Sequence, residues 1–411
     1  MRQSNVNIAV FYFNPLTDMK SSRRIKLLNI GRAEGILVAT SIAVSFLILE
    51  IVLRMVRPIP VLPVGTDSPN ARLYGWGYAP GATILQRHPD TGEEFYTVAN
   101  SGGWKDVEHQ LEKEQGTIRI LILGDSNTFG LVPLEANYPR VLERLLGEAG
   151  FKVEVITMAY GGWSTDQALV ALKHAGLSYH PDIVISQFDT NDISENLTRE
   201  DIALFKPFRF YVKDDTLEMR TVEPELPISD QIRRWLFKSH VLFYMDRARV
   251  HLMRRIRQIE ESQVEDTGLW WRRYEDPESQ EAWLLYEKLL EEMKRVVEEN
   301  GAVFYLFNEV EEGHLVWDRR AGKIHQDENG QDYVIQDGKK YFYDFYEHVE
   351  CLKEVTNRIG VDMIPNKRVY IRFDRDPHPN EEGNLKMAED IFEFLITDDR
   401  ASQLLQQSKM E

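Results

Sequence analysis

An uncharged apolar run stands close to the start of the chain. Residues 36–49 read ILVATSIAVSFLIL, and the apolar character continues past Glu50 to Val56. This length suits a helix that crosses a bilayer, and a single acid is tolerable where the helix meets the headgroups. The pattern predicts a membrane-spanning anchor over residues 33–57.

The charges on either side of this run indicate its orientation. The basic residues shortly before it are Lys20, Arg23, Arg24, Lys26 and Arg32, and those after it are Arg54 and Arg57. Because loops rich in Lys and Arg stay inside, we expect residues 1–32 to be cytoplasmic. The rest of the chain would then lie on the periplasmic side of an inner membrane, held by a single pass. A cleaved signal peptide and a buried core helix are the alternatives. The lack of a clear small-x-small cleavage site argues against the signal peptide, and the lack of a polar face argues against the core helix.

After residue 117 short apolar runs alternate with amphipathic stretches. β-branched apolar runs predict strands at 117–123, 153–158, 182–188, 302–307 and 361–364. Helical periodicity predicts helices at 138–148, 165–175, 279–299, 344–358 and 381–396. Strands that alternate with helices indicate an α/β fold, in which a parallel sheet is covered by helices on both faces.

Irregular stretches interrupt this alternation and suggest a division of the chain. The predicted parts are a linker and N-terminal extension at 58–116, a main domain at 117–398 with insertions at about 197–278 and 311–340, and a tail at 399–411. Within the first insertion, residues 208–220 predict a hairpin with an Asp-Asp turn. A basic amphipathic helix is expected around residues 240–260. We interpret this insertion as a cap over the functional site.

Composition excludes several classes of function. The formal net charge of −17 argues against nucleic-acid binding, which needs clustered Lys and Arg. The single cysteine, Cys351, permits neither an intramolecular disulfide nor a cysteine-based metal cluster, and we expect it to be a small core residue on a helix. No familiar metal-binding spacing appears, so no metal and no cofactor are expected. The sequence does not indicate an oligomeric state.

Candidate chemistry begins at the end of the first predicted strand. In LILGDSNTFG, Ser126 comes three residues after Leu123, and Gly124 allows the chain to turn sharply. Ligands of open parallel sheets bind at the carboxyl ends of the strands, so Ser126 would project there. A serine hydroxyl is a weak nucleophile and requires a base within hydrogen-bond reach. A plain strand-to-helix turn, with Asp125 or Ser126 as N-cap, is the alternative interpretation.

A candidate base lies in the loop before the last predicted helix. His378 stands in DRDPHPNEEGN, with Asp376 two residues earlier and Asp374 four residues earlier. A carboxylate beside an imidazole orients the ring and stabilises its protonated form, which is the pairing that a general base needs. An acidic loop with an incidental histidine is the alternative.

Two further loops follow predicted strands and offer hydrogen-bond donors. MAYGGWSTDQ follows the second strand, where Gly161 or Gly162 could supply a backbone N–H. FDTND follows the third strand, where Asn191 could supply its side-chain amide. Donors of this kind stabilise the oxyanion formed during acyl transfer. Taken singly, each loop is equally explained as a glycine turn or an Asx turn.

These four loops together resemble the conserved blocks of the SGNH hydrolase superfamily, also called GDSL esterases. The matching positions are Gly124-Asp125-Ser126, Gly162, Asn191-Asp192 and the pair Asp376-His378. The stretch ANSGGWKD at 99–106 is similar to one found in the bacterial membrane-tethered branch. The resemblance covers about residues 95–398 without the insertions. It implies a flavodoxin-like fold, Ser126 as nucleophile, His378 as base, Asp376 as its orienting acid with Asp374 in reserve, and an oxyanion hole formed by Ser126, Gly162 and Asn191.

The chain departs from this family pattern at three positions. Asp189 stands where the third block usually begins with Gly, Thr157 replaces an Asn, and Arg375 occupies the usual position of the acid.

The first hypothesis for the function is a serine-dependent esterase acting on an acylated carbohydrate or lipid outside the cytoplasm. An O-acyltransferase that modifies an exopolysaccharide through the same triad is the alternative. A non-catalytic scaffold or glycan-binding protein of the same fold is the second alternative.

Overall fold

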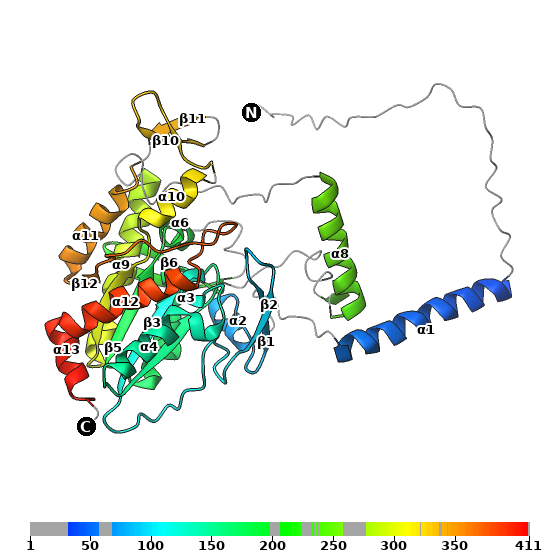
Figure 1. The fold of residues 1–411 in the computed structure, drawn as a ribbon, viewed down its shortest axis with the longest axis horizontal. Coiled ribbons are helices and arrows are strands. Elements are labelled where there is room, and N and C mark those ends of the chain that lie inside the picture. Colours follow the sequence, from blue (N-terminus) through cyan, green and yellow to red (C-terminus); the bar gives the residue numbers. More distant parts are fainter. Residues whose placement is uncertain are drawn as a thin grey trace. The chain divides into compact units, whose positions relative to one another are not determined.

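The computed structural model describes most of the chain (Figure 1). The described residues are 32–56, 68–197, 206–222, 232, 235–236, 238–257, 277–320, 322–336, 339–342 and 344–409. The predicted cytoplasmic segment before residue 32, residues 58–67 of the predicted linker and N-terminal extension, and residues 258–276 of the first insertion lie outside them. The described residues fall into two compact units, one comprising residues 32–56 with Ser239–Val241 and the other comprising the rest of the described chain.

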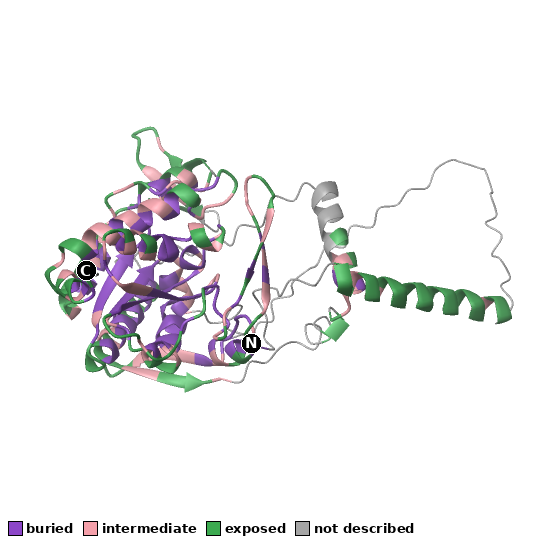
Figure 2. Cartoon of the chain, turned by 60° about the horizontal axis from the view of Figure 1, so that its bottom comes forward, coloured by how far each residue is buried: buried purple, intermediate pink, exposed green. Residues whose placement is uncertain are grey.

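The first unit contains the long helix α1 (Arg32–Val56). Residues Ala33–Val56 are long and apolar enough to cross a membrane, and they are exposed along the helix (Figure 2). The acid within the run, Glu50, accepts hydrogen bonds from Ser239 Oγ at 2.8 Å and from the N–H of Val241 at 3.0 Å. This helix therefore has the length and composition of a membrane anchor or of a signal sequence.

The second unit is built on a five-stranded sheet in which every pairing is parallel. In spatial order the strands are β12 (Asp362–Ile364), β8 (Val303–Asn308), β5 (Ile183–Phe188), β3 (Ile118–Gly124) and β4 (Val153–Ala159). Every residue of β3 is buried, as expected of a central strand covered on both faces. The predicted strands are thus confirmed to within about two residues at each end.

Helices cover both faces of this sheet and confirm the three-layer α/β/α architecture (Figure 1). On one face Ile120 and Ile122 of β3 belong to a core formed with α4 (Tyr138–Glu148), α12 (Glu381–Thr397) and α13 (Asp399–Gln406). On the other face Leu121 and Leu123 belong to a core formed with α5 (Thr165–His174), α9 (Pro277–Glu299) and α11 (Glu347–Ile359). Alternate residues of a strand point to opposite faces, so one apolar run supplies both cores.

The insertions and extension have small structures of their own. The predicted hairpin is confirmed as β6 (Phe208–Lys213) paired with β7 (Thr216–Thr221), and Asp214 and Asp215 adopt the left-handed backbone that a two-residue hairpin turn demands. The remaining elements are α2 (Pro69–Tyr74), β1 (Thr83–Arg87), β2 (Glu94–Val98), α3 (Ser126–Phe129), η1 (Leu134–Ala136), η2 (Gly176–Tyr179), α6 (Asn191–Asn196), α8 (His240–Arg257), α10 (Glu312–Arg320), β9 (His325–Gln326), β10 (Asp332–Gln336) and β11 (Lys339–Phe342).

Two details of the predicted helices can be compared with the structure. The helix predicted from residue 344 begins at Glu347, because the carboxylate of Asp344 accepts the N–H of Tyr346 at 2.9 Å and forms a turn there. Cys351 is buried on α11, which confirms its prediction as a small core residue.

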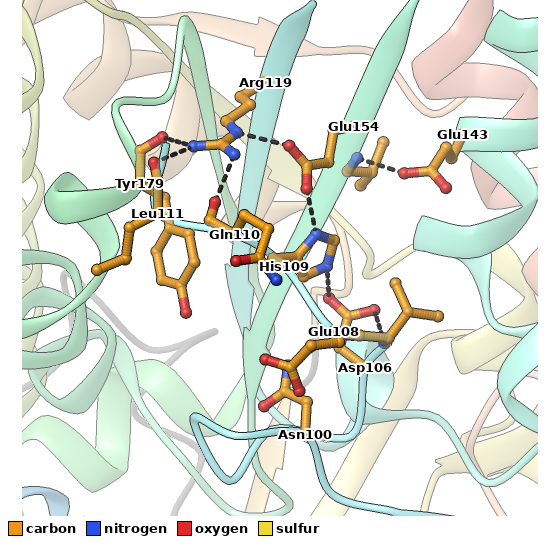
Figure 3. A network of polar contacts seen from close by, with 12 residues as sticks. Asn100, Asp106, Glu108, His109, Gln110, Leu111, Arg119, Glu143, Glu154 and Tyr179 are labelled. Atoms are coloured by element: carbon orange, nitrogen blue, oxygen red, sulfur yellow. Dashed lines mark hydrogen bonds and ion pairs between the residues drawn. The ribbon is translucent and has the colours of Figure 1, made fainter. Parts of the chain in front are cut away.

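A buried polar network joins the N-terminal extension to the sheet (Figure 3). His109 contacts Asp106 through Nε2 at 3.0 Å and Glu154 through Nδ1 at 2.7 Å. Glu154 also accepts a hydrogen bond from Arg119 Nε at 2.6 Å. Asp106 belongs to the stretch 99–106, and its Oδ2 accepts the N–H of Thr157 on β4 at 2.7 Å. The network therefore fixes this extension against the start of β3 and the edge strand β4.

This network predicts a specific pH dependence of stability. Burial alone would lower the pKa of His109, but the hydrogen bonds and charges of Asp106 and Glu154 outweigh it and raise the pKa. A raised folded-state pKa gives stability that is fully present below the unfolded value of about 6.5 and is lost as pH rises through the folded value. We expect His109→Gln to lower the free energy of unfolding by roughly 1–3 kcal/mol at pH 6. Urea titrations at pH 6 and pH 8 should show a smaller cost at pH 8.

The matched control for this prediction is His325→Gln, since the side chain of His325 is exposed. That variant should change the free energy of unfolding by less than about 0.5 kcal/mol at either pH. An equal cost of His109→Gln at both pH values would show that the histidine contributes by packing and not by its charge.

Candidate active site

The parallel sheet brings three of the candidate loops to one edge. Gly124 at the end of β3 is paired with Ala159 at the end of β4, and Leu123 is paired with Ser186 near the end of β5. Strand β3 lies between the other two strands. The serine loop is therefore flanked on one side by the glycine loop after β4 and on the other by the asparagine loop after β5.

Ser126 begins the short helix α3 immediately after the strand. The side chain of Asp125 caps this helix by accepting the N–H of Asn127 at 2.8 Å. A Cβ at Gly124 would collide with the side chain of Thr128, so the tight turn requires glycine at that position. Ser126 is half-buried, and neither its Oγ nor its N–H has a hydrogen-bond partner among the described residues. Both groups are therefore available to a ligand.

The glycine loop lies directly beside the serine. A Cβ built on Gly161 would lie 3.9 Å from the Cβ of Ser126. Trp76 Nε1 donates a hydrogen bond to the carbonyl oxygen of Gly161 at 2.9 Å. The N–H of Gly162 belongs to the same planar peptide and points opposite to that carbonyl. Trp76 therefore fixes the direction of the Gly162 N–H, for which the described part of the chain offers no acceptor.

The amide of Asn191 is already engaged by neighbouring acceptors. Its Nδ2 donates to the carbonyl oxygen of Trp163 at 3.1 Å and to Glu195 Oε2 at 3.2 Å. Its Oδ1 is buried and has no hydrogen-bond partner within the described ranges. The structure thus brings Asn191 next to the end of the glycine loop, with both amide hydrogens occupied.

His378 and Asp376 form a close pair in the loop before α12. His378 Nδ1 lies 2.5 Å from Asp376 Oδ1, and the same oxygen accepts the N–H of His378 at 3.0 Å. Burial alone would raise the pKa of Asp376, but the hydrogen bond and charge of His378 hold that pKa below its ordinary value. Asp374 pairs instead with Arg320 at 3.0 Å and is exposed. Only Asp376 of the two acids contacts the imidazole.

A chain of hydrogen bonds ties this loop to the serine side of the sheet. Asn384 on α12 donates to the carbonyl oxygen of Pro379 at 3.0 Å and accepts the N–H of Tyr138 at 3.0 Å. Tyr138 begins α4, and its hydroxyl lies 2.9 Å from Thr128 Oγ1 in the serine helix. The histidine loop therefore reaches the same edge of the sheet as Ser126. Within the described residues no direct hydrogen bond joins His378 to Ser126.

Asp189, the residue in place of the usual glycine, has close partners. Its Oδ2 accepts a hydrogen bond from Asn127 Nδ2 at 2.7 Å, and its Oδ1 accepts the N–H of Thr190 at 2.6 Å. The carboxylate is thus held by donors on both oxygens, one of them from the residue next to Ser126. These neutral donors tie the Asp189 carboxylate to the serine loop.

A serine at the carboxyl edge of a parallel sheet in this α/β/α fold is the arrangement expected of a GDSL-type ester hydrolase. The model of the GDSL-like lipase/acylhydrolase family matches residues 122–333, and the chain belongs to that family. The match includes Ser126, Gly162 and Asn191, and it ends before His378. Family membership makes the chain an esterase-type enzyme. A search of curated proteins finds no significant match.

Several solved structures are similar to this chain at low identity. TesA is 11% identical, covering 67% of this chain and 97% of its own, with a TM-score of 0.33. The acetyl xylan esterase AlAXEase is 15% identical, covering 68% and 100%, with a TM-score of 0.35. A lipase/acylhydrolase from Enterococcus faecalis is 14% identical, covering 68% and 95%, with a TM-score of 0.33.

The structure also adds residues that sequence reasoning missed. Trp76 lies in the N-terminal extension, 85 positions before the carbonyl that it holds. Lys105 is almost fully buried, and its Nζ donates to the carbonyl oxygens of Phe129 at 3.1 Å, the last residue of the serine helix, and of Val132 at 2.9 Å, just after that helix. Lys105 belongs to the stretch ANSGGWKD. The sequence signal for its role was the similarity of that stretch to the membrane-tethered branch of the superfamily, and not a local pattern of residues.

Proposed function

We propose that Ser126, His378 and Asp376 form the catalytic triad of an esterase. Ser126 Oγ would attack the acyl carbon while His378 Nε2 takes its proton and later returns it to the leaving group. Asp376 would hold the imidazole in the tautomer that leaves Nε2 free to accept. The observation that carries this proposal is the His378–Asp376 contact of 2.5 Å in a loop tied to the serine side of the sheet. Catalysis requires His378 Nε2 to come within hydrogen-bond reach of Ser126 Oγ.

The oxyanion hole in this proposal is formed by the N–H groups of Ser126 and Gly162. Both lack acceptors within the described ranges, and Trp76 orients the second of them. Backbone donors of this kind stabilise the tetrahedral intermediate because they need not reorganise as charge develops. Asn191 would join them by turning one amide hydrogen away from Glu195 or Trp163 when substrate binds.

We further propose that the enzyme is anchored by α1 and works on the extracytoplasmic side, on an acylated carbohydrate or lipid. The support is the exposed apolar helix and the excess of basic residues before it. An anchor keeps the catalytic unit close to the membrane surface, where ester-bearing lipids and exported polysaccharides are concentrated.

A fluorophosphonate probe tests the chemistry. With detergent-solubilised full-length protein, we expect a single phosphonyl adduct on the tryptic peptide that contains Ser126, located by mass spectrometry. With p-nitrophenyl acetate as acyl donor, release of acetate should exceed acetyl transfer to an added glycan. Transfer that outpaces hydrolysis would establish the acyltransferase alternative. Absence of any adduct would favour the non-catalytic scaffold.

The same labelled band reports on the anchor. After alkaline carbonate extraction of cells, the full-length labelled protein should remain in the membrane pellet. A shorter labelled protein in the soluble fraction would instead identify the apolar run as a cleaved signal peptide.

A further inference from the structure

A second cluster of chemically active side chains lies at the carboxyl edge of the sheet. Asp189 follows β5, Glu309 follows β8, and His314 lies on α10 within the second insertion. One ligand atom from each of the three residues lies within 4.8 Å of the other two. Two strand ends and a helix of the insertion thus direct two carboxylates and an imidazole toward one point.

Atoms in this cluster lack the partners that buried polar groups ordinarily have. Glu309 is completely buried. Its Oε1 accepts from Arg372 Nη2 at 2.6 Å, but its Oε2 has no hydrogen-bond partner among the described residues. His314 Nδ1 is also buried, and the described part of the chain offers it no hydrogen-bond partner. Because buried polar atoms are nearly always satisfied, two such atoms in one cluster indicate an additional ligand.

The balance of charge points to a cation. Three carboxylates lie near one another here, those of Asp189, Glu309 and Glu311. Glu311 lies 3.6 Å from Arg372. Arg372 is buried and pairs with Glu309 and Glu311, whereas no ion pair among the described residues joins a cation to Asp189. Buried carboxylates in excess over their cations are costly unless another positive charge is bound.

The surroundings of His314 match those of a metal-binding histidine. Its Nε2 lies 3.3 Å from Asp318 Oδ2, one turn later on α10. Ligating histidines usually donate the second ring N–H to a carboxylate, which fixes the tautomer and directs the other nitrogen to the metal. Here that other nitrogen is the unpartnered Nδ1.

We propose that Asp189, Glu309 and His314 bind one divalent cation of the zinc type. Two carboxylate oxygens and one imidazole nitrogen suit such borderline ions better than Mg²⁺ or Ca²⁺, which prefer oxygen ligands alone. The cation joins α10 of the insertion to the ends of β5 and β8. Through the contact of Asp189 with Asn127, it also supports the loop that carries Ser126.

Metal titration of the full-length protein tests this site without using ester hydrolysis. The protein is solubilised in detergent, stripped with EDTA, desalted and titrated with Zn²⁺ against a chromogenic chelator of known affinity. We expect one equivalent of tightly bound Zn²⁺, and weaker binding of Mg²⁺ and Ca²⁺. Glu309→Gln and His314→Gln should each weaken Zn²⁺ binding by about 100-fold, and Asp318→Asn by about 10-fold.

His325→Gln is the matched control, because that exposed histidine lies on β9 of the same insertion. It should bind Zn²⁺ as the wild type does. A wild-type protein that binds no stoichiometric metal would overturn the proposal, whatever the folding of the variants. Undiminished binding by folded His314→Gln would also overturn it. Esterase activity is not measured, so failure of the triad and failure of this site remain distinguishable.

Discussion

Replacing Ser126 with alanine should reduce kcat/KM for p-nitrophenyl acetate by roughly 10⁵-fold. The hydroxyl is the atom that would become acylated, and no neighbouring side chain within the described residues can replace it at the end of β3. The N–H groups of residues 126 and 162 would survive the change, so residual rate above the uncatalysed reaction should remain. The measurement is steady-state hydrolysis by the detergent-solubilised full-length variant, with circular dichroism to confirm that it is folded.

Ser178→Ala is the control for this experiment. Ser178 is an exposed serine shortly before β5, at the opposite edge of the sheet from the proposed site. Its removal should leave kcat/KM within about twofold of wild type, as expected for surface substitutions. Full activity in Ser126→Ala would mean that a different residue carries the chemistry.

Asp376→Asn should lower kcat by about 10⁴-fold while leaving KM nearly unchanged. Asparagine keeps the size of the side chain and can still accept the N–H of His378. Its amide, however, allows the imidazole to hold the wrong tautomer, and it cannot stabilise the imidazolium that forms when Ser126 loses its proton. The effect therefore falls on the chemical step and not on substrate binding.

Asp374→Asn supplies a control in the same loop, with the same change of charge. Asp374 pairs with exposed Arg320, a contact of the kind that contributes little. Its variant should retain kcat within about threefold. A reversal, with Asp374→Asn inactive and Asp376→Asn active, would assign the orienting role to the other acid and require the loop to rearrange.

Most of the fold could be predicted because its signals are local. The run TIRILIL is β-branched, uncharged after Arg119 and too short for a helix, and it forms the central strand. The Asp-Asp pair between two strands predicted a hairpin, and both residues adopt the left-handed backbone. The start of the helix after residue 344 was predicted wrongly, because a side-chain turn at Asp344 competes with the helix over three residues.

The candidate site was predictable to a smaller extent. Ser126, Gly162 and Asn191 follow recognised strands, so their arrival at one edge is a consequence of a parallel sheet. The direction in which each of these groups points could not be predicted from the sequence. The sequence FDTND does not indicate that the side-chain amide of Asn191 donates hydrogen bonds to Trp163 and Glu195.

The sequence by itself determined the α/β alternation, the apolar helix, the order of the chemical loops and the family that they resemble. These depend on residues close together in the chain, where periodicity and turn chemistry act. The tertiary structure alone decided which distant groups meet: Trp76 with Gly161, Asn384 with Tyr138, and Asp189 with Glu309 and His314. Such contacts join residues tens to hundreds of positions apart. Their geometry follows from the packing of helices on the sheet, which no local pattern encodes.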